Sequence, residues 1–529
     1  MGNYLNPGNG AFEISVNDDI YIDKSGIISF VNNRIGKRKR FLCVSRPRRF
    51  GKSMTAEMLA AYYDKTCNSH RLFQNLEIEK DISYEKHLNQ YDVIFLNIQQ
   101  FLRKAGDLSN LTYCIEECIL NEIREAYPKY VEDGKTYLPD VLENIYQKVQ
   151  NEKKGFIFII DEWDCIFRVA KNDMDTQKMY LDFLQDLFKD RIYVKVAYMT
   201  GILPVKKYGT HSALNIFDEF SMIAPGKIAK YVGFTEYEVQ MLCEKYHMDF
   251  SETKKWYDGY RFKQAPHIYN PKSIVDAMME EDFGSYWTNT ETYEALQIYI
   301  DLDMDGLRQA IISMLSGSDI VIDTGTFQND MTSFRCKDDI LTLLVHLGYL
   351  AYDEVAHSVF IPNEEVRDEF IRAVKNGNRP ELVKAIQKSD ELLDATIRMD
   401  AQKVADLIEE AHSANTSPIF YNNEQSLRSV IQLAYISRVD DYLTIQELPT
   451  GIGYADLVLL PRKNADKPAM IIELKWDMSV EGAIAQVKKN RYVEAIEHYG
   501  GEILLVAINY DKSTKKHTCV IERYTPLSE

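Results

Sequence analysis

The chain has 529 residues, of which 45% are hydrophobic and 27% are charged, and its net charge is −18. This length exceeds what one hydrophobic core organises, so about two to four domains are expected. The composition is typical of globular rather than disordered proteins, and the negative charge disfavours avid nonspecific binding to nucleic acid.

Signals for membrane insertion or secretion are missing from the sequence. No run approaches the roughly 20 apolar residues that a membrane-spanning helix needs. The N-terminal residues lack the basic start and apolar stretch of a secretory signal. Eight scattered cysteines form no CxxC pair, and Cys114 and Cys118, one helical turn apart, are interpreted as part of a buried helix face. We therefore expect a reduced, cytoplasmic protein without zinc and without a membrane partner.

A run of basic residues contrasts with the acidic composition. The segment 34–49 contains eight arginines and lysines and no acid: Arg34, Lys37, Arg38, Lys39, Arg40, Arg46, Arg48 and Arg49. Such a run is either a solvated loop or a surface that faces phosphate groups. Both interpretations stay open.

Four short apolar runs predict buried strands in the first half of the chain. They occupy residues 41–45, 93–98, 156–160 and 193–199, and longer segments with helical patterning separate them. Because continuous apolar strands that alternate with helices are typical of a sheet covered on both faces, we predict a mostly parallel sheet and an α/β fold.

The sequence RPRRFGKS at residues 46–53 predicts a phosphate-binding loop. It fits the pattern GxxxxGK[ST] from Gly51 onward, with Arg46 at the first glycine position. A predicted strand enters it and a helix predicted at 54–63 leaves it, an arrangement that points backbone amides at a polyphosphate. Lys52 is expected to reach the β- and γ-phosphates and Ser53 to bind Mg²⁺; a loop merely capped by Ser53 is the alternative. The candidate nucleotide-binding residues here are Arg46, Pro47, Arg48, Arg49, Phe50, Gly51, Lys52, Ser53 and Met54.

Two further strand ends carry polar residues. The segment GFIFIIDEWD places Asp161 and Glu162 at the end of an apolar strand. Beside the phosphate-binding loop, Asp161 is expected to hold the Mg²⁺ shell and Glu162 to orient or deprotonate the attacking water. The strand at 193–199 ends in Thr200 and Gly201, so Thr200 is either a sensor of the γ-phosphate or a turn residue.

The composition changes from about residue 235 onward. Residues from about 235 to 289 are aromatic and turn-rich and predict an appended helical lid. Residues 290 to about 410 are predicted to be mainly helical, with a small hairpin at 348–362. From about residue 424 a helix, strands around Asp456 and Glu473, a helix near Gln486 and a strand at 503–508 are expected.

The segment 449–476 predicts a second site. Asp456 lies in one predicted strand, and Glu473 and Lys475 project from the same face of the next, because side chains two residues apart share a face. Both carboxylates and the backbone carbonyl of Leu474 form an all-oxygen site suited to Mg²⁺ or Mn²⁺. Lys475 is expected to position a water or to neutralise the transition state. The alternative is a structural cluster with a simple Glu-x-Lys ion pair. Glu424 offers a further acid, and the helix of Gln486 carries lysines that are able to face a nucleic-acid backbone.

These motifs together resemble a bacterial family that joins an AAA-ATPase-like domain to a PD-(D/E)XK nuclease domain. The resemblance rests on YIDKS, RPRRFGKS, IIDEWD, TGILP, GFTEYEV, WYDGYRF, YNPKS, IPNEEVR and the block ADLVL…IIELK…Q, which extend from about residue 21 to about residue 492. Arg46 replaces the first glycine of a standard P-loop, as in the arginine-rich version of this family. Ala455 replaces the proline that precedes the first acid of the nuclease signature.

The resemblance implies ATP as the nucleotide, with Lys52, Ser53, Asp161 and Glu162 at the binding and hydrolysis motifs. It also implies that Asp456, Glu473 and Lys475 form the nuclease signature, with Glu424 and Gln486 in support. The expected domains are an AAA-like P-loop ATPase at 1–230, a lid-like subdomain at 231–290, a helical linking domain at 291–410 and a restriction-endonuclease-like α/β domain at 411–529.

Three functions are compatible with this sequence. The preferred one is an ATPase that regulates a metal-dependent nuclease acting on nucleic acid, with DNA favoured over RNA. The second is a nucleotide-switched binding or assembly protein with a non-catalytic nuclease fold, which the acidic net charge supports. The third is an ATPase acting mechanically on protein partners. A homo-oligomer is compatible with each of them.

Overall fold

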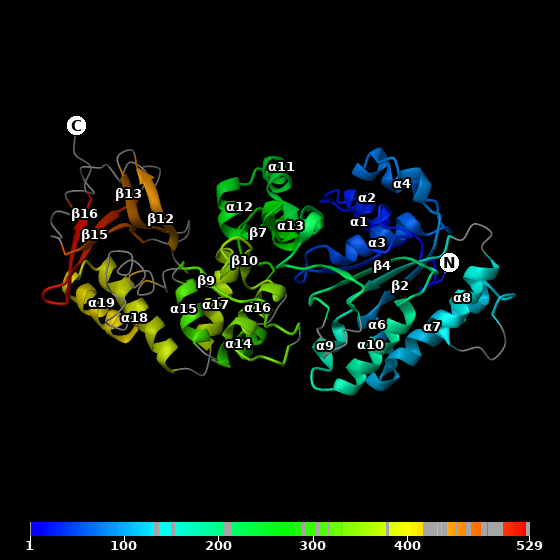
Figure 1. Ribbon diagram of the computed structural model, residues 1–529. Coiled ribbons are helices and arrows are strands. Elements are labelled where there is room, and N and C mark those ends of the chain that lie inside the picture. Colours follow the sequence, from blue (N-terminus) through cyan, green and yellow to red (C-terminus); the bar gives the residue numbers. More distant parts are fainter. Residues whose placement is uncertain are drawn as a thin grey trace. The chain divides into compact units, whose positions relative to one another are not determined.

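The computed structural model divides into two compact units, which are drawn in Figure 1. Unit 1 comprises residues 1–290 and 321–365, and unit 2 comprises residues 291–320 and 366–529. The residues that the structure describes are 2–131, 137–149, 154–205, 214–287, 293–415 without 303, 305, 316, 330 and 377–379, then 431, 435, 442–450, 453–461, 467–477, 484 and 501–524. The four predicted domain boundaries stay predictions.

Unit 1 is built on a five-stranded parallel sheet with the order β2-β3-β4-β1-β5. The strands are β1 (Phe41–Ser45), β2 (Asp92–Asn97), β3 (Phe156–Asp161), β4 (Val194–Gly201) and β5 (Asp218–Phe220). The four apolar runs therefore form strands within one or two residues of the predicted positions, and the parallel sheet is confirmed. The short edge strand β5 was not predicted, because its sequence DEF has no apolar run.

Helices cover both faces of this sheet (Figure 1). On one side lie α1 (Gly10–Val16), α2 (Gly26–Asn32) and α3 (Lys52–Tyr63), and on the other lie five helices that share a core with the strands. These helices are α6 (Ile98–Ala105), α7 (Leu111–Ala126), α8 (Leu138–Lys148), α9 (Cys165–Val169) and α10 (Met174–Phe188). Short elements connect them: α4 (His70–Phe73), η1 (Glu77–Lys80), α5 (Tyr84–His87) and η2 (Leu108–Asn110). Cys114 and Cys118 lie on α7 and pack against that core, so they share a helix face as predicted, but this face is only partly buried at both residues.

The aromatic segment of unit 1 forms a small subdomain that contains a sheet as well as the predicted helices. Its three-stranded antiparallel sheet has the order β6-β8-β7. The elements are η3 (Gly226–Tyr231), β6 (Phe234–Thr235), α11 (Glu236–Tyr246), α12 (Phe250–Tyr257), β7 (Tyr260–Phe262), β8 (Ala265–Tyr269) and α13 (Pro271–Glu280). The motif GFTEYEV starts α11 with a capping box, in which Thr235 and Glu238 satisfy each other's backbone amides. Unit 1 ends with α16 (Lys337–Leu347) and the predicted hairpin of β10 (Ala351–Asp353) and β11 (Ser358–Phe360). The two-residue strand β9 (Ile320–Val321) lies at the boundary of the units along the chain.

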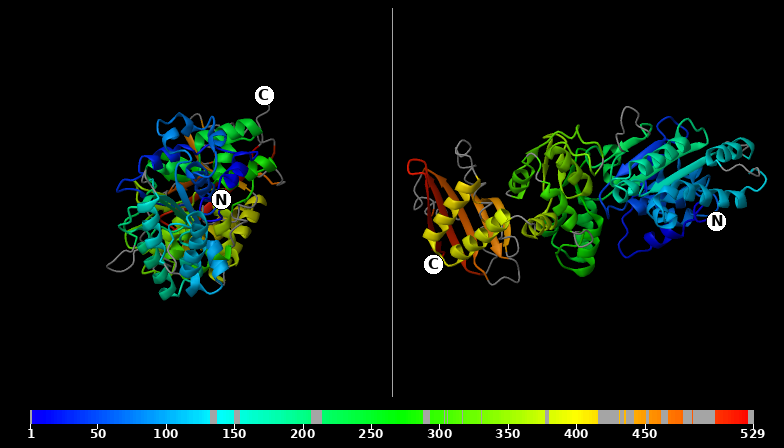
Figure 2. Two further views of the ribbon diagram at one scale, coloured as in Figure 1. Left: turned by 90° about the vertical axis from the view of Figure 1, so that its right-hand side faces the viewer. Right: turned by 90° about the horizontal axis from the view of Figure 1, so that it is seen from below.

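Unit 2 combines helices with a mixed sheet. The helices are α14 (Tyr293–Asp301), α15 (Leu307–Leu315), α17 (Glu364–Asn376), α18 (Pro380–Ile397) and α19 (Ala401–Asn415). The strands β12 (Tyr442–Thr450), β13 (Gly453–Pro461), β14 (Ala469–Trp476), β15 (Ile503–Asp511) and β16 (Lys516–Arg523) pair in sequence order. The pair β14–β15 is parallel and the other neighbours are antiparallel. The right-hand view of Figure 2 shows α18 and α19, in yellow, across one face of this sheet, and their apolar residues share a core with β13, β14 and β15.

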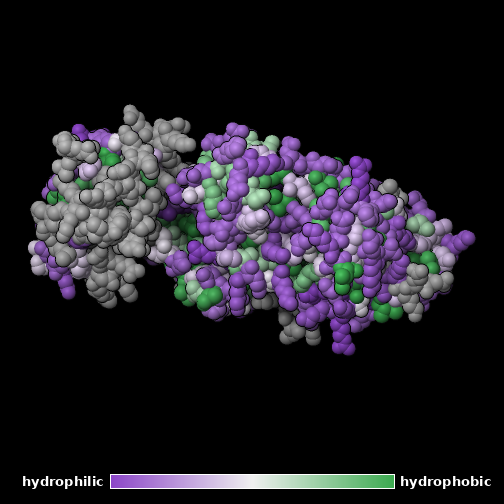
Figure 3. Space-filling view, turned by 90° about the horizontal axis from the view of Figure 1, so that it is seen from above, coloured by the Kyte–Doolittle hydropathy of each residue, from purple (hydrophilic) through white to green (hydrophobic). Residues whose placement is uncertain are grey.

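Two observations concern the prediction that the chain has no membrane-spanning segment. Over unit 1 the face drawn in Figure 3 is mainly hydrophilic, with hydrophobic residues interspersed. Among the helices that the structure describes, none combines the length and the apolar character needed to cross a membrane.

Candidate functional site

The motif RPRRFGKS forms the turn between β1 and α3. Gly51 is the N-cap of α3 and adopts a left-handed conformation with φ of +82°, which glycine reaches without steric cost. Arg49 also has a positive φ, of 67°. Lys52 and Ser53 then occupy the first turn of the helix, where free backbone amides and the helix dipole attract anions.

The ammonium of Lys52 is held inside this turn. Its side chain is buried, and Nζ donates a 2.7 Å hydrogen bond to the carbonyl oxygen of Pro47. Burial lowers the pKa of Lys52, while the carboxylates of Glu162 and Asp161 act in the opposite direction. The loop therefore presents a concentrated positive charge, which an approaching phosphate oxygen is able to bind in place of the carbonyl.

Ser53 and Asp161 meet although 108 residues separate them in sequence. Ser53 Oγ donates to Asp161 Oδ2 at 2.8 Å, and the amide of Asn97 on the neighbouring strand donates to the same oxygen at 3.2 Å. Burial raises the pKa of Asp161, and the bond from Ser53 opposes that shift. Asp161 Oδ1 is buried and has no hydrogen-bond partner among the described residues. A serine hydroxyl beside a carboxylate with one unsatisfied oxygen fits a hard divalent cation such as Mg²⁺.

A cavity of about 730 Å³ opens beside this turn. Arg48, Arg49, Lys52 and Arg168 supply positive charge to its lining, and Phe50, Gly51, Ser53, Met54 and Glu162 also contribute. Its apolar part is formed by Phe12, Ile20, Tyr21, Ile22, Met58 and Val275. Cations at one part and apolar side chains at another match the needs of a nucleotide, whose phosphates are charged and whose base is flat and largely apolar.

Four of the predicted nucleotide-binding residues do not line this cavity: Arg46, Pro47, Thr200 and Asp161, the last of which contacts it only through Ser53. The guanidinium of Arg46 is fully buried and donates to the carbonyl oxygens of Ser45 and Phe220 at 2.8 and 2.9 Å. Burial lowers its pKa to about 10. Pro47 contributes its carbonyl to Lys52. Thr200 is buried opposite Asp161 in the register of β3 and β4.

The basic run is divided by strand β1. Arg48 and Arg49 follow its carboxyl end and line the cavity, whereas residues 34–40 precede its amino end. There Arg34 pairs with Asp218 of β5, and Arg40 donates to the carbonyl of Arg191 before β4, so both arginines join this segment to its neighbours in the fold. The run therefore does not form one surface, because a five-residue strand separates its two parts by about 17 Å; only Arg48 and Arg49 line the cavity, and a phosphate-facing role for them stays a prediction.

Residues after α3 in sequence, from the small subdomain, from the segment that follows it and from the end of α16, contact the phosphate-binding loop. Trp287 Nε1 donates to the carbonyl oxygen of Arg48 at 3.2 Å, and the rings of Phe50 and Tyr260 pack edge to face at 5.2 Å. Gly348, with φ of +93°, lies so close to Pro47 that a Cβ there would come within 2.7 Å of its side chain. The loop is thus fixed by residues far away in sequence.

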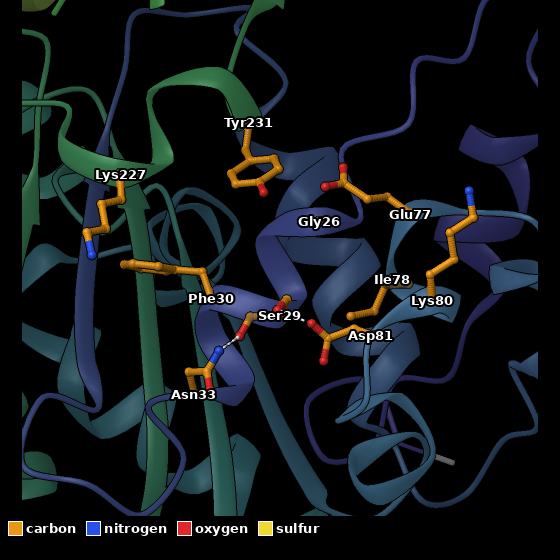
Figure 4. Close-up of a pocket in the computed structure, with 10 residues that line it drawn as sticks. All are labelled: Gly26, Ser29, Phe30, Asn33, Glu77, Ile78, Lys80, Asp81, Lys227 and Tyr231. Carbon is orange, nitrogen blue, oxygen red and sulfur yellow. Dashed lines mark hydrogen bonds between the residues drawn. The ribbon is translucent and has the colours of Figure 1, made fainter. Parts of the chain in front are cut away.

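A second cavity, of about 390 Å³, lies between α2, η1 and η3 (Figure 4). Its two carboxylates already have partners: Asp81 accepts from Ser29 and Ser83, and Glu77 lies 3.9 Å from Lys230. It does not join the residues of the nucleotide motif, so the first cavity is the candidate site.

In unit 2, the structure brings Asp456, Glu473 and Lys475 to one face of the sheet. Leu457 pairs with Ile472 across β13 and β14, so Asp456 and Glu473 occupy neighbouring positions on the two strands. Asp456 Oδ2 accepts from the backbone amide of Leu474 at 2.9 Å, and Lys475 Nζ lies 3.0 Å from Glu473 Oε1. Because side chains alternate along a strand, these three project from the face opposite α18 and α19, toward which Leu474 points.

This cluster is compact but not complete as a metal site. Asp456 and Glu473 are 7% and 2% exposed, so their charges lie in a mostly dry environment. Among the described residues no group of three acids, histidines or cysteines is arranged to hold a metal ion. Glu424 and Gln486, the predicted supporting residues, lie outside the described residues, as does the helix predicted near Gln486.

Comparisons with known proteins match both halves of the chain. A family described as predicted AAA-ATPase matches residues 11–210, and the PD-(D/E)XK nuclease superfamily matches residues 422–519. The chain joins an AAA-ATPase-like domain to a PD-(D/E)XK nuclease-superfamily domain. A protein of Azotobacter chroococcum, described as an uncharacterized protein in the vnfD 5′ region, is 23% identical over 398 residues, 72% of each chain.

Solved structures similar to the chain include two archaeal proteins. The Walker-type ATPase of Pyrococcus abyssi is 12% identical with a TM-score of 0.34, and the match covers 66% of this chain and 94% of that one. The ORC2 protein of Aeropyrum pernix is 10% identical with a TM-score of 0.25, and the match covers 68% and 98%.

Several residues of the AAA-ATPase-like site were not predicted from the sequence. Arg168 lines the cavity six residues after Glu162 and pairs with it, and Asp164 contacts Arg168 in turn. Glu162 was predicted as a catalytic residue, but nothing in the sequence spacing indicated that Arg168 pairs with it. Trp287 contacts the loop across 239 residues, which no local pattern reveals.

Proposed function

We propose that the AAA-ATPase-like domain binds and hydrolyses ATP with Mg²⁺ in the cavity beside residues 46–53. The observation that carries this proposal is the contact of Ser53 with Asp161, whose second oxygen is unsatisfied among the described residues, at the mouth of a positively charged helix N-terminus. When bound, the metal ion would neutralise phosphate charge and orient the triphosphate.

The residues of the cavity take distinct roles in this proposal. Ser53 and Asp161 hold the metal, Lys52 exchanges the Pro47 carbonyl for phosphate oxygens, and the amides from Gly51 onward surround the phosphates. Glu162 accepts a proton from the attacking water. The apolar wall that includes Phe12 and Val275 excludes water from the base.

We further propose that the nuclease-superfamily domain cleaves phosphodiester bonds of nucleic acid, DNA in preference to RNA, under the control of the first domain. Asp456 and Glu473 share one face and are able to bind Mg²⁺ or Mn²⁺ together with the Leu474 carbonyl. Lys475 beside Glu473 is placed to neutralise charge that develops on the phosphate.

The test is a paired measurement on the full chain. Cleavage of single- and double-stranded DNA and RNA is followed with Mg²⁺ or Mn²⁺, in the presence and absence of ATP, while ATP turnover is recorded in the same samples. The proposal expects metal-dependent cleavage of DNA whose rate changes with ATP. Turnover of ATP without cleavage of any of the four substrates would remove the nuclease half.

One observation favours a second candidate, a nucleotide-switched assembly protein with a non-catalytic nuclease fold. Both acids have partners within the chain, Asp456 in the Leu474 amide and Glu473 in Lys475. In that case ATP binds tightly without cleavage, and Glu473→Ala leaves the cellular role of the protein unchanged.

A further inference from the structure

Glu162 is held in an unusual backbone conformation at the edge of the cavity. Its φ is +55°, in the left-handed region that residues with a side chain rarely adopt. Backbone bonds on both sides maintain it: Trp163 N donates to Thr200 O at 3.0 Å, and Cys165 N donates to Glu162 O at 2.9 Å. Such conformations persist where the surrounding structure enforces them, and they concentrate at functional sites.

Arg168 fixes the side chain of the same residue. The guanidinium of Arg168, on α9, pairs through Nη2 with Glu162 Oε2 and lies 3.3 Å through Nε from Asp164 Oδ2. The side chains of Arg168, Glu162 and Asp164 are only 12%, 18% and 0% exposed. In such a protected place a charged pair is screened little by solvent and holds its geometry.

Asp164 connects this pair to the end of strand β4. Its Oδ2 accepts a 2.9 Å hydrogen bond from the backbone amide of Leu203. Gly201, the last residue of β4, faces the other oxygen so closely that a Cβ would come within 2.4 Å of Asp164 Oδ1. A continuous path therefore runs from the end of β4 through Asp164 and Arg168 to Glu162 and the cavity.

We propose that Arg168 is a positioning residue that holds the carboxylate of Glu162 in place for ATP hydrolysis and ties it to the end of β4. This inference rests on the proposed ATPase function. Because Arg168 acts through Glu162, its removal impairs turnover of bound nucleotide and leaves the binding of nucleotide nearly unchanged. The same role explains why Glu162, Asp164 and Arg168 occur together in the sequence D-E-W-D-x-x-x-R of residues 161–168, since Arg168 contacts both acids.

The experiment compares full-length variants by steady-state ATP hydrolysis and by calorimetric binding of ADP with Mg²⁺. For Arg168→Met we expect kcat to fall about 100-fold, the effect of a misplaced catalytic group, while the Kd for ADP changes less than about threefold. Arg168→Lys keeps one positive charge but lacks the two-sided guanidinium, so it recovers part of kcat. In a Glu162→Gln background, Arg168→Met should lower kcat by less than a further factor of about two, because both substitutions disable the same pair of side chains.

Arg34→Met is the matched control. It breaks a partly buried arginine–carboxylate pair, with Asp218, at the other end of β1, so kcat should stay within about twofold of the wild-type value. Arg168→Met that weakens ADP binding as much as it lowers kcat would overturn the proposal, since Arg168 would then bind nucleotide itself. The proposal would also be overturned if the double variant lost kcat by the product of the losses of Arg168→Met and Glu162→Gln, since the two residues would then act independently.

Failure of the inference differs from failure of the proposed function. If the wild-type chain hydrolyses ATP and both Arg168→Met and Arg168→Lys keep its kcat, the role of Arg168 is rejected and the proposed ATPase function stands. A wild-type chain that binds ADP but never hydrolyses ATP rejects both. Thermal unfolding of each variant shows whether it is folded. If Arg168→Met does not fold, the kcat and the ADP affinity of Arg168→Lys decide whether Arg168 positions Glu162.

Discussion

Two buried cations of the motif RPRRFGKS serve different parts of the domain. Lys52 is 5% exposed and directed into the phosphate-binding turn, where the carbonyl of Pro47 holds it. Arg46 is fully buried and donates to Phe220 at the end of β5, with its guanidinium 5.3 Å from the ring centre of Phe262. The arginine at the first glycine position therefore joins the end of β1 to an edge strand and to the small subdomain.

At the residue scale, Lys52→Ala is expected to abolish ATP turnover and to weaken ATP binding about 10- to 100-fold. The estimate corresponds to one lost hydrogen bond to a charged group, about 1.5–3 kcal/mol. Lys39→Ala is the control, because Lys39 belongs to the same basic run but is exposed before the amino end of β1. Calorimetric titration with ATP measures both. Equal losses in the two variants would contradict the division of the basic run.

His87 provides a prediction of pH dependence. It is buried, its Nδ1 lies 2.7 Å from the Tyr91 hydroxyl, and burial lowers its pKa to about 4. Between about pH 6.5 and pH 4 the unfolded chain therefore binds a proton at this position that the folded chain does not, and stability falls as pH falls. The variant His87→Gln should therefore lose less stability over this pH range than the wild type, as measured by thermal unfolding. The exposed His70→Gln should follow the wild type.

At the scale of elements, the phosphate-binding loop depends on the small subdomain and α16. Trp287 and Gly348 contact Arg48 and Pro47, and neither Trp287 nor Gly348 lines the cavity. Such contacts hold a binding loop in one shape before the ligand arrives, which lowers the entropic cost of binding.

Trp287→Phe replaces the buried indole by a smaller aromatic ring and removes the hydrogen bond to Arg48. We expect ATP to bind about 3- to 10-fold more weakly, in line with roughly 1 kcal/mol for one hydrogen bond. Trp256→Phe is a matched control, because Trp256 Nε1 donates at the same 3.2 Å distance to Glu252, away from the loop. A larger effect of Trp256→Phe than of Trp287→Phe on ATP affinity would contradict the support role.

At the scale of the whole molecule, the two proposed activities should be separable by substitution. Asp456→Asn retains an oxygen for the Leu474 amide but removes the charge, so metal-dependent cleavage should fall more than about 100-fold with ATP turnover unchanged. Asp394→Asn, an exposed acid on α18, is the control. Both rates are measured in one reaction mixture. Parallel loss of ATP turnover in Asp456→Asn would show that the acid stabilises the chain rather than catalyses.

Local patterns in the sequence determined much of this architecture. Mainly apolar runs of five to seven residues became the central strands, and the glycine, lysine and serine after β1 became a helix N-terminus. The pattern at 449–476 became an antiparallel strand pair with Asp456 and Glu473 on one face. These features follow from residue spacing alone, because strand and helix periodicity decide which side chains share a face.

Only the tertiary structure decided what lies beside these elements. β5 joins the sheet because β1 leaves an edge for it, although its own sequence has little strand character. The inward direction of Arg46, the separation of the basic run, the pairing of Arg168 with Glu162 and the contact of Trp287 with Arg48 are likewise absent from any local pattern. Such contacts depend on how distant segments pack into one core, and the spacing of residues along the chain does not encode that distance.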